Sequence, residues 1–242
     1  MVPRSVPDWR DEQAYAPLLL ADRSLLCWEW LRRVPAYRTD QGDPHAPPLK
    51  WGLVRFEDPD RGVPDARPMW SSEHHSAVLK CRCLPHGKAG DLIDLKDPRW
   101  SSISSGAVLH CCLTDGVRSI RLDINGARSG ASKLCLDYQL HGFESLERPL
   151  AVLLRLRRFR RSSSIAPESV TPERRARQVL LLRAFDALSD HATQRDMAFE
   201  LLGAPVETPG WRLDQPDVRA RAQRLARSAR AMAVGGYRAL LS

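Results

Sequence analysis

The stretch PDVRARAQRLARSARAMA, residues 216–233, decides how the last part of this chain folds. It begins with a proline, which a helix tolerates in its first turn, and Gly235 and Gly236 follow its end. Between these limits apolar residues recur at steps of three and four, which places them along one side of a helix. They are Val218, Ala222, Leu225, Ala229 and Met232. The spacing therefore predicts an amphipathic helix from about Pro216 to Ala233.

The opposite side of this predicted helix is rich in arginine. Arg224, Arg227 and Arg230 follow one another at steps of three, and Arg219 and Arg221 flank them in the first turns. A recognition helix needs an apolar side that docks on supporting helices, and cations that reach phosphates and guanine edges. These five arginines are therefore candidate DNA-binding residues. A solvated helix surface is the alternative, because rows of charge often only face water.

Two more helices are predicted before the arginine-rich one. Thr171, Pro172 and Glu173 supply an N-cap, a proline at the first position and an acid in the first turn, so a helix begins there and runs to about Ser189. A short helix follows within HATQRDMAFELLG, residues 191–203.

Thr193 is the expected N-cap of this short helix. Asp196 is placed to complete a capping box, and Gly203 ends the helix. We assign Thr193, Gln194 and Arg195 to DNA contact together with the five arginines. The following segment, 204–215, is predicted to be a loop, and it is longer than the turn of an ordinary helix-turn-helix. Which helix enters the DNA groove, and where a wing forms, therefore stay open.

The net charge of +8 lies entirely in the last part of the chain. Residues 1–150 have 20 basic and 20 acidic residues, whereas residues 151–242 have 17 basic and 9 acidic ones. All 17 of those basic residues are arginine, whose planar guanidinium suits phosphate and guanine. This asymmetry is typical of a protein in which one part meets a polyanion.

The remaining sequence predicts an α+β fold of three parts. Residues 1–72 are expected to form a small helical domain with a proline-rich extension, in which Pro35 ends the helical pattern. Residues 73–161 alternate in polarity and predict a small antiparallel sheet, with a hairpin at Asp115-Gly116. Its last segment, 150–159, is compatible with a strand or a helix. Residues 162–242 form the predicted (winged) helix-turn-helix.

Other functions find little support in the sequence. No apolar run is long enough to cross a membrane and no signal peptide is present, so a cytoplasmic protein is expected. Phosphate-binding and hydrolase motifs are absent, so we expect neither an enzyme nor a cofactor. A zinc site built from His74, His75, Cys81, Cys83 and His86 lacks a familiar spacing, and buried thiols are the favoured interpretation.

One N-terminal block invites a different role. The sequence WEWLRR contains two tryptophans, which are expected to be core or interface anchors because large aromatic residues dominate both environments. We therefore assign Trp28, Trp30, Arg32 and Arg33 to a protein-contact surface.

Both ends of the chain resemble parts of one bacterial regulator family. The segment HATQRDMAFELLG resembles the supporting helix of helix-turn-helix proteins. The following PDVRARAQRLARSARAMAVGGYRALL is similar to the C-terminal signature of a domain found in activators and antiactivators of integrative and conjugative element transfer. The N-terminal segment, with Asp8-Trp9-Arg10, Tyr15, the WEWLRR block, Pro35, Tyr37 and Trp51-Gly52, resembles the transcriptional regulator-like domain that precedes it. Resemblance at both ends matches the two-part, FseA-type activators.

The resemblance implies a transcriptional activator with a winged helix-turn-helix. Its expected targets are excision and conjugative transfer genes of a mobile element, and its expected partners are promoter DNA and either RNA polymerase or a single-domain antiactivator. The alternative is an antiactivator-like protein that pairs with a related regulator and does not bind DNA itself. The sequence leaves the operator, the oligomeric state and the direction of regulation open.

Overall fold

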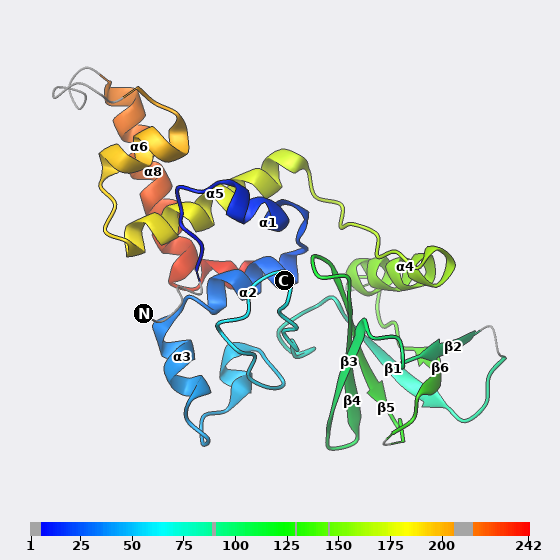
Figure 1. The fold of residues 1–242 in the computed structure, drawn as a ribbon. Coiled ribbons are helices and arrows are strands. Elements are labelled where there is room, and N and C mark those ends of the chain that lie inside the picture. The colour runs from blue at the N-terminus through cyan, green and yellow to red at the C-terminus, as the bar shows by residue number, and fades with distance from the viewer. Residues whose placement is uncertain (1–5, 89–90, 129, 145, 206–214) are drawn as a thin grey trace.

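A helical body and a six-stranded sheet lie side by side in the computed structural model (Figure 1), which describes residues 6–88, 91–128, 130–144, 146–205 and 215–242. The helical body contains elements from both ends of the chain. The sheet and one covering helix come from the middle. Because the termini meet in one body, the fold is not a linear string of domains.

The N-terminal part is helical, as predicted. It contains the short helices η1 (Gln13–Tyr15) and α1 (Ala16–Leu20), then α2 (Arg23–Leu31), α3 (Pro35–Gln41) and η2 (Pro48–Trp51). Pro35 does not end the helical pattern, because it occupies the first turn of α3, where its missing N–H costs nothing. The proline-rich stretch packs inward through Leu53 and Trp70, which form an isolated bridge.

The central sheet has the strand order β2-β6-β1-β5-β4-β3. Its strands are β1 (Val78–Leu84), β2 (Leu92–Asp94), β3 (Trp100–Ser105), β4 (Val108–Thr114), β5 (Ser119–Asn125) and β6 (Lys133–Tyr138). The hairpin predicted at Asp115-Gly116 joins β4 to β5, with Thr114 opposite Ser119. The sheet is not purely antiparallel, however, since β1 runs parallel to β5. The long connection between these two strands makes the parallel pairing possible.

The ambiguous segment at 150–159 is helical. It belongs to α4 (Glu147–Ser162), which lies on the sheet (Figure 1) and buries Val152, Leu156 and Phe159. These side chains join the strand residues Leu79, Ile120 and Leu122 in one apolar cluster. Their spacing of four and three residues is the helical period, so packing on the sheet selects the helix over a seventh strand.

The C-terminal helices match their predicted bounds. They are α5 (Pro172–Ser189), α6 (Gln194–Leu202) and α8 (Pro216–Ala233). The structure adds a final 3-10 helix, η4 (Gly236–Leu240), for which the sequence gave no prediction. The Thr171 side chain caps α5 by accepting a hydrogen bond from the Arg174 N–H. Capping signals and apolar periodicity were therefore sufficient to place these helices.

One apolar core joins the two ends of the chain. Leu25, Trp28 and Tyr37 from the N-terminal helices pack with Leu182 of α5 and with Tyr237 of η4. Residues 1–72 and 162–242 were predicted to be separate domains. They do not fold as separate domains, because they share this core. The physical reason is that the N-terminal helices cover apolar faces of the C-terminal ones: α2 packs on η4 and α1 packs on α5.

A buried ionic cluster runs through this shared core. The Arg33 guanidinium of the α2–α3 connection donates from Nε and Nη2 to Asp186 of α5, at 2.7 and 2.9 Å, and from Nη1 to Glu29 at 2.6 Å. Arg32 Nε donates to Glu29 at 2.8 Å, and the Tyr15 hydroxyl donates to Asp186 at 2.7 Å. The cluster has two cations and two carboxylates, so its charges balance inside the protein.

The protein-contact surface predicted for the WEWLRR block is therefore wrong. Trp28 and Trp30 are at most 1% exposed, and Arg32 and Arg33 are 2% and 9% exposed. The arginines are paired with carboxylates from α2 and from α5, which allows them to be buried. Residue types alone cannot distinguish an interface between molecules from a core between segments.

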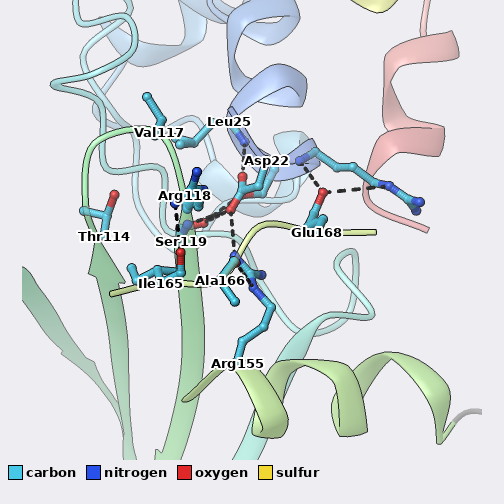
Figure 2. Close-up of polar contacts among 12 residues, drawn as sticks. Asp22, Leu25, Thr114, Val117, Arg118, Ser119, Arg155, Ile165, Ala166 and Glu168 are labelled. Carbon is cyan, nitrogen blue, oxygen red and sulfur yellow. Dashed lines mark hydrogen bonds and ion pairs between the residues drawn. The ribbon is translucent and has the colours of Figure 1, made fainter. Parts of the chain in front are cut away.

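A second polar junction attaches the sheet to the helical body (Figure 2). Asp22 caps α2 by accepting from the Leu25 N–H at 3.0 Å, and its other oxygen accepts from the Ser119 N–H and hydroxyl at 2.6 and 2.9 Å. Glu168, in the connection before α5, accepts from the Arg23 N–H at 3.0 Å. Burial and the nearby charge of Asp22 raise the pKa of Glu168. The start of α2 is thus fixed to β5 and to the α4–α5 connection.

Replacing Asp186 with alanine is expected to destabilise the protein by about 3–5 kcal/mol, because Arg33 would stay buried without its main partner. Urea denaturation followed by far-UV circular dichroism measures the change. Asp60→Ala, which breaks the exposed pair with Arg38, is the control and should cost less than about 1 kcal/mol. Equal losses in the two variants would contradict the role given to the buried cluster.

Acid should weaken the fold through His75. Burial lowers the pKa of this imidazole to about 4, and its Nδ1 lies 3.1 Å from the Leu241 carbonyl oxygen, to which the neutral ring donates. The unfolded chain binds this proton near pH 6.5, so stability falls as the pH drops from 6.5 to 4, by up to about 3 kcal/mol for this group. His75→Gln retains a donor without titrating and should flatten that part of the pH profile. Parallel profiles for the two proteins would exclude this assignment.

Candidate nucleic-acid interface

Small side chains bring α8 close to its two supporting helices. Ala222, Leu225, Ala226 and Ala229 form its buried stripe. Opposite them are alanines of α5 and α6, and all of these are fully buried: Ala184, Ala187 and Ala198. Because the distance between packed helices depends on the side chains at the contact, this alanine-rich interface holds α8 tightly on α5 and α6.

The five candidate arginines of α8 are all exposed: Arg219, Arg221, Arg224, Arg227 and Arg230. At 3.6 residues per turn, Arg224 and Arg227 lie directly opposite the buried stripe, and the other three flank them. Within the described residues, no acidic side chain forms an ion pair with any of the five. The helix therefore presents cationic groups that the described fold leaves available to an external anion.

The start of α6 has the predicted cap. The Thr193 hydroxyl accepts from the Asp196 N–H at 3.2 Å, and the Asp196 carboxylate accepts from the Thr193 N–H at 2.8 Å. The hydrogen bonds that this carboxylate accepts from the Thr193 N–H and hydroxyl lower the pKa of Asp196. Thr193 and Arg195 are exposed and Gln194 is half-exposed, so all three predicted residues reach the surface. The structure thus gives the two sets of candidates a common support, because α6 and α8 pack on each other.

An N-terminal tryptophan completes this group of helices. Trp9 is 2% exposed and packs against Ala187 of α5, Met197 of α6 and Ala226 of α8. Its indole N–H donates to Asp190 at 3.2 Å, and its carbonyl oxygen accepts from Arg183 at 3.2 Å. Sequence reasoning gave Trp9 no role here, since nothing in a short polar segment shows that it docks nearly two hundred residues further along the chain. The only signal was its place in the family resemblance.

The connection between α6 and α8 is only partly described. The predicted loop at 204–215 falls largely on residues 206–214, which lie outside the described residues. At its borders, the Gln215 side-chain amide donates to the Pro205 carbonyl oxygen at 2.9 Å, which joins the end of α6 to the start of α8. After Tyr138 the described residues contain no strand, and the predicted wing is therefore not confirmed.

Of the residues weighed for zinc, His75 and Cys81 are buried in the core, Cys83 is half-buried, and His74 and His86 are exposed. His75 faces the Leu241 carbonyl, and burial raises the pKa of Cys81 to about 12, so its thiol stays protonated. In the described part of the chain, no three histidine, cysteine or acidic side chains are grouped to hold a metal ion.

Among the described residues, no helix is long and apolar enough to span a membrane.

Two family models match this chain. Residues 140–242 match a model described as "T6SS, Transcription factor, DNA binding domain". Residues 8–54 match a model described as "Proteobacterial transcriptional regulator-like domain". Comparison with curated proteins and with solved structures gave no match.

The matches and the geometry agree on the class of protein. The DNA-binding model covers α4 to η4, which includes the exposed arginines of α8. The second model covers the N-terminal helices that share a core with α5. Together they support a DNA-binding transcriptional regulator, a class that generally acts by binding and not by catalysis.

Enlarging the α8 interface should disturb the placement of its arginines. Ala226→Leu inserts three carbons between Trp9, Ala187 and Met197, and is expected to cost about 1–3 kcal/mol by overpacking. Thermal denaturation measures this loss. Ala231→Leu, on the exposed side of the same helix, is the matched control and should leave stability nearly unchanged. If Ala226→Leu left the thermal stability unchanged, α8 would not be packed as described.

Proposed function

We propose that the chain binds promoter DNA by placing α8 in the major groove. The supporting observation is the row of exposed arginines opposite a stripe of fully packed small residues. Arg224 and Arg227, at the centre of the exposed face, reach guanine edges, where a guanidinium makes two hydrogen bonds. Arg219, Arg221 and Arg230, at the flanks, meet phosphates on either side of the groove.

The first turn of α6 contacts the DNA backbone in this proposal. Free N–H groups at a helix N-terminus favour anions, and Arg195 adds a cation beside the Thr193 cap. The Gln194 amide supplies a further hydrogen-bond donor for phosphate oxygens, beside the Thr193 hydroxyl, which donates to Asp196 within the cap. Because α6 packs on α8, contact at α6 fixes the angle at which α8 lies in the groove.

We further propose that the bound promoters control excision and conjugative transfer genes, which the protein activates. Support comes from the resemblance of both chain ends to two-part activators of such elements. An activator of this kind contacts RNA polymerase, and a single-domain antiactivator that resembles residues 162–242 would oppose it. A second candidate set of targets is T6SS genes, favoured by the description of the model that matches residues 140–242.

Sequencing the chromosomal fragments that purified protein retains distinguishes these targets. Enrichment of promoters beside integrase or conjugation genes supports the transfer activator, whereas enrichment beside T6SS genes supports the second candidate. Retention of no fragment, together with co-purification of a related regulator without DNA, would favour an antiactivator-like pairing protein and contradict the proposal.

Replacing Arg224, Arg227 and Arg230 with alanine should abolish binding to a retained promoter fragment. Each lost phosphate contact lowers the slope of log K against log salt by about 0.9, and each lost bidentate base contact costs about 1–3 kcal/mol. Fluorescence anisotropy at several salt concentrations measures both effects. The far-UV spectrum should not change, because the three side chains are exposed.

The matched control removes three exposed cations elsewhere, by Arg55→Ala, Arg82→Ala and Lys88→Ala. This protein has the same net charge as the α8 triple variant but retains every α8 arginine. It should bind the promoter fragment almost as the unchanged protein does. If both triple variants lose affinity equally, net charge and not the α8 face explains binding.

A further inference from the structure

The charge excess of the C-terminal part is divided between two helices. α8 has five arginines and one acid, Asp217, and α4 has six arginines and one acid, Glu147. In both helices the acid lies in the first turn. The other residues after 162 have seven arginines and eight acids, so they carry no excess. The cationic character that points to a polyanion therefore belongs to α4 as much as to α8.

Contacts within the protein occupy only some of the α4 arginines. Arg155 Nε donates to the Ala166 carbonyl oxygen at 2.9 Å (Figure 2), and Arg160 Nη1 donates to that of Leu92 at 2.6 Å. These two side chains lie beside the buried face of the helix and attach it to the α4–α5 connection and to β2. Both side chains thus hold α4 to main-chain carbonyls of neighbouring segments, and Arg155 Nη2 also lies 3.9 Å from an Asp22 carboxylate oxygen.

Three other arginines of α4 point away from the sheet. Arg157, Arg158 and Arg161 are exposed and lie on the side opposite Val152, Leu156 and Phe159. In the described residues none of the three forms an ion pair with an acidic side chain. This outward group of three, here called the α4 triad, repeats the arrangement of α8: an apolar side packed on its support and guanidinium groups facing solvent.

We propose that the α4 triad is a second DNA contact, which binds phosphates of the same duplex that α8 reads. The inference rests on the proposed function and extends it to α4. Part of this helix, residues 150–159, is compatible in sequence with either a strand or a helix. The match to a DNA-binding model begins at residue 140 and so includes all of α4. Three clustered guanidinium groups fit neighbouring phosphates of one backbone, and such contacts do not depend on base sequence.

The placement of the two helices suits contacts on one duplex. α4 leads through residues 163–171 into the start of α5, whereas α8 packs near the other end of α5, against Ala184 and Ala187 (Figure 1). The 18 residues of α5 span about 27 Å at 1.5 Å per residue. One turn of B-DNA rises about 34 Å. The 163–171 connection adds to this separation, so the two contacts are expected about one helical turn or more apart on the duplex.

The test uses the full chain and a 30-base-pair duplex of arbitrary sequence, because phosphate contacts need no operator. Anisotropy titrations over a range of salt are compared for the unchanged protein and for Arg157→Ala, Arg158→Ala, Arg161→Ala combined. Loss of three phosphate contacts should reduce the slope of log K against log salt by up to about 2.7, which weakens binding at 0.1 M salt by up to about 500-fold if the two proteins bind equally at 1 M salt. Stability should change little, because the side chains are exposed.

Two controls separate DNA contact from other effects. Replacing the α4 triad with lysine preserves the charge, so it should retain most of the slope while removing the planar guanidinium groups. The variant with Arg55, Arg82 and Lys88 changed to alanine has the same net charge as the alanine variant of the α4 triad and should retain the full slope. The proposal is supported if the slope falls in the protein with Arg157, Arg158 and Arg161 changed to alanine, here called the alanine triad, and not in either control.

Other outcomes overturn it. If the alanine triad binds the duplex with an unchanged slope while the α8 triple variant does not bind, α4 makes no DNA contact and the proposed function stands. If the lysine triad loses as much slope as the alanine triad, the effect does not come from charge on phosphates. If the unchanged protein fails to bind any duplex, the proposed function fails and this inference fails with it.

Discussion

The buried ion pair between Arg33 and Asp186, formed by two hydrogen bonds, is the interaction on which the rest of the helical body depends. Burying either charge alone would cost several kcal/mol, so the two must be brought together whenever the core closes. Glu29 and the Tyr15 hydroxyl complete the hydrogen bonds, so that the cluster is satisfied without water. Because Arg33 follows α2 and Asp186 belongs to α5, the pair fixes the N-terminal helices against the helix that supports α8. The angle of the candidate recognition helix is thereby determined by both ends of the chain.

Because of this contact, the regulator does not divide into an N-terminal domain and a separate DNA-binding domain. The N-terminal part is not a separate module joined by a linker, since Trp9 packs among α5, α6 and α8. An event that moved the N-terminal helices would also move the helices that present the arginines. The alanines at the α8 interface strengthen this dependence, because closely packed helices have little freedom to shift independently. Binding at the DNA face and packing at the N-terminus are thus linked by direct contact.

The sheet contributes in a different way. It holds α4 through an apolar face and is itself attached to the helical body by Asp22, which caps α2 and accepts from Ser119 of β5. Through this junction the outward arginines of α4 have a fixed position relative to those of α8. A regulator with cations on two supported helices can combine base recognition at one with phosphate contacts at the other.

The sequence by itself determined the elements whose signals are local. The caps at Thr171 and Thr193, the periodicity of 216–233 and the turn at Asp115-Gly116 each depend on residues a few positions apart, so they could be read directly. Only the tertiary structure decided which apolar faces meet. In the structure the WEWLRR block lies in the core and not on the predicted contact surface, Trp9 packs against α8, and β1 runs parallel to β5. The physical reason is that burial and ion pairing depend on partners far along the chain, and an arginine looks the same in sequence whether it meets Asp186 or solvent.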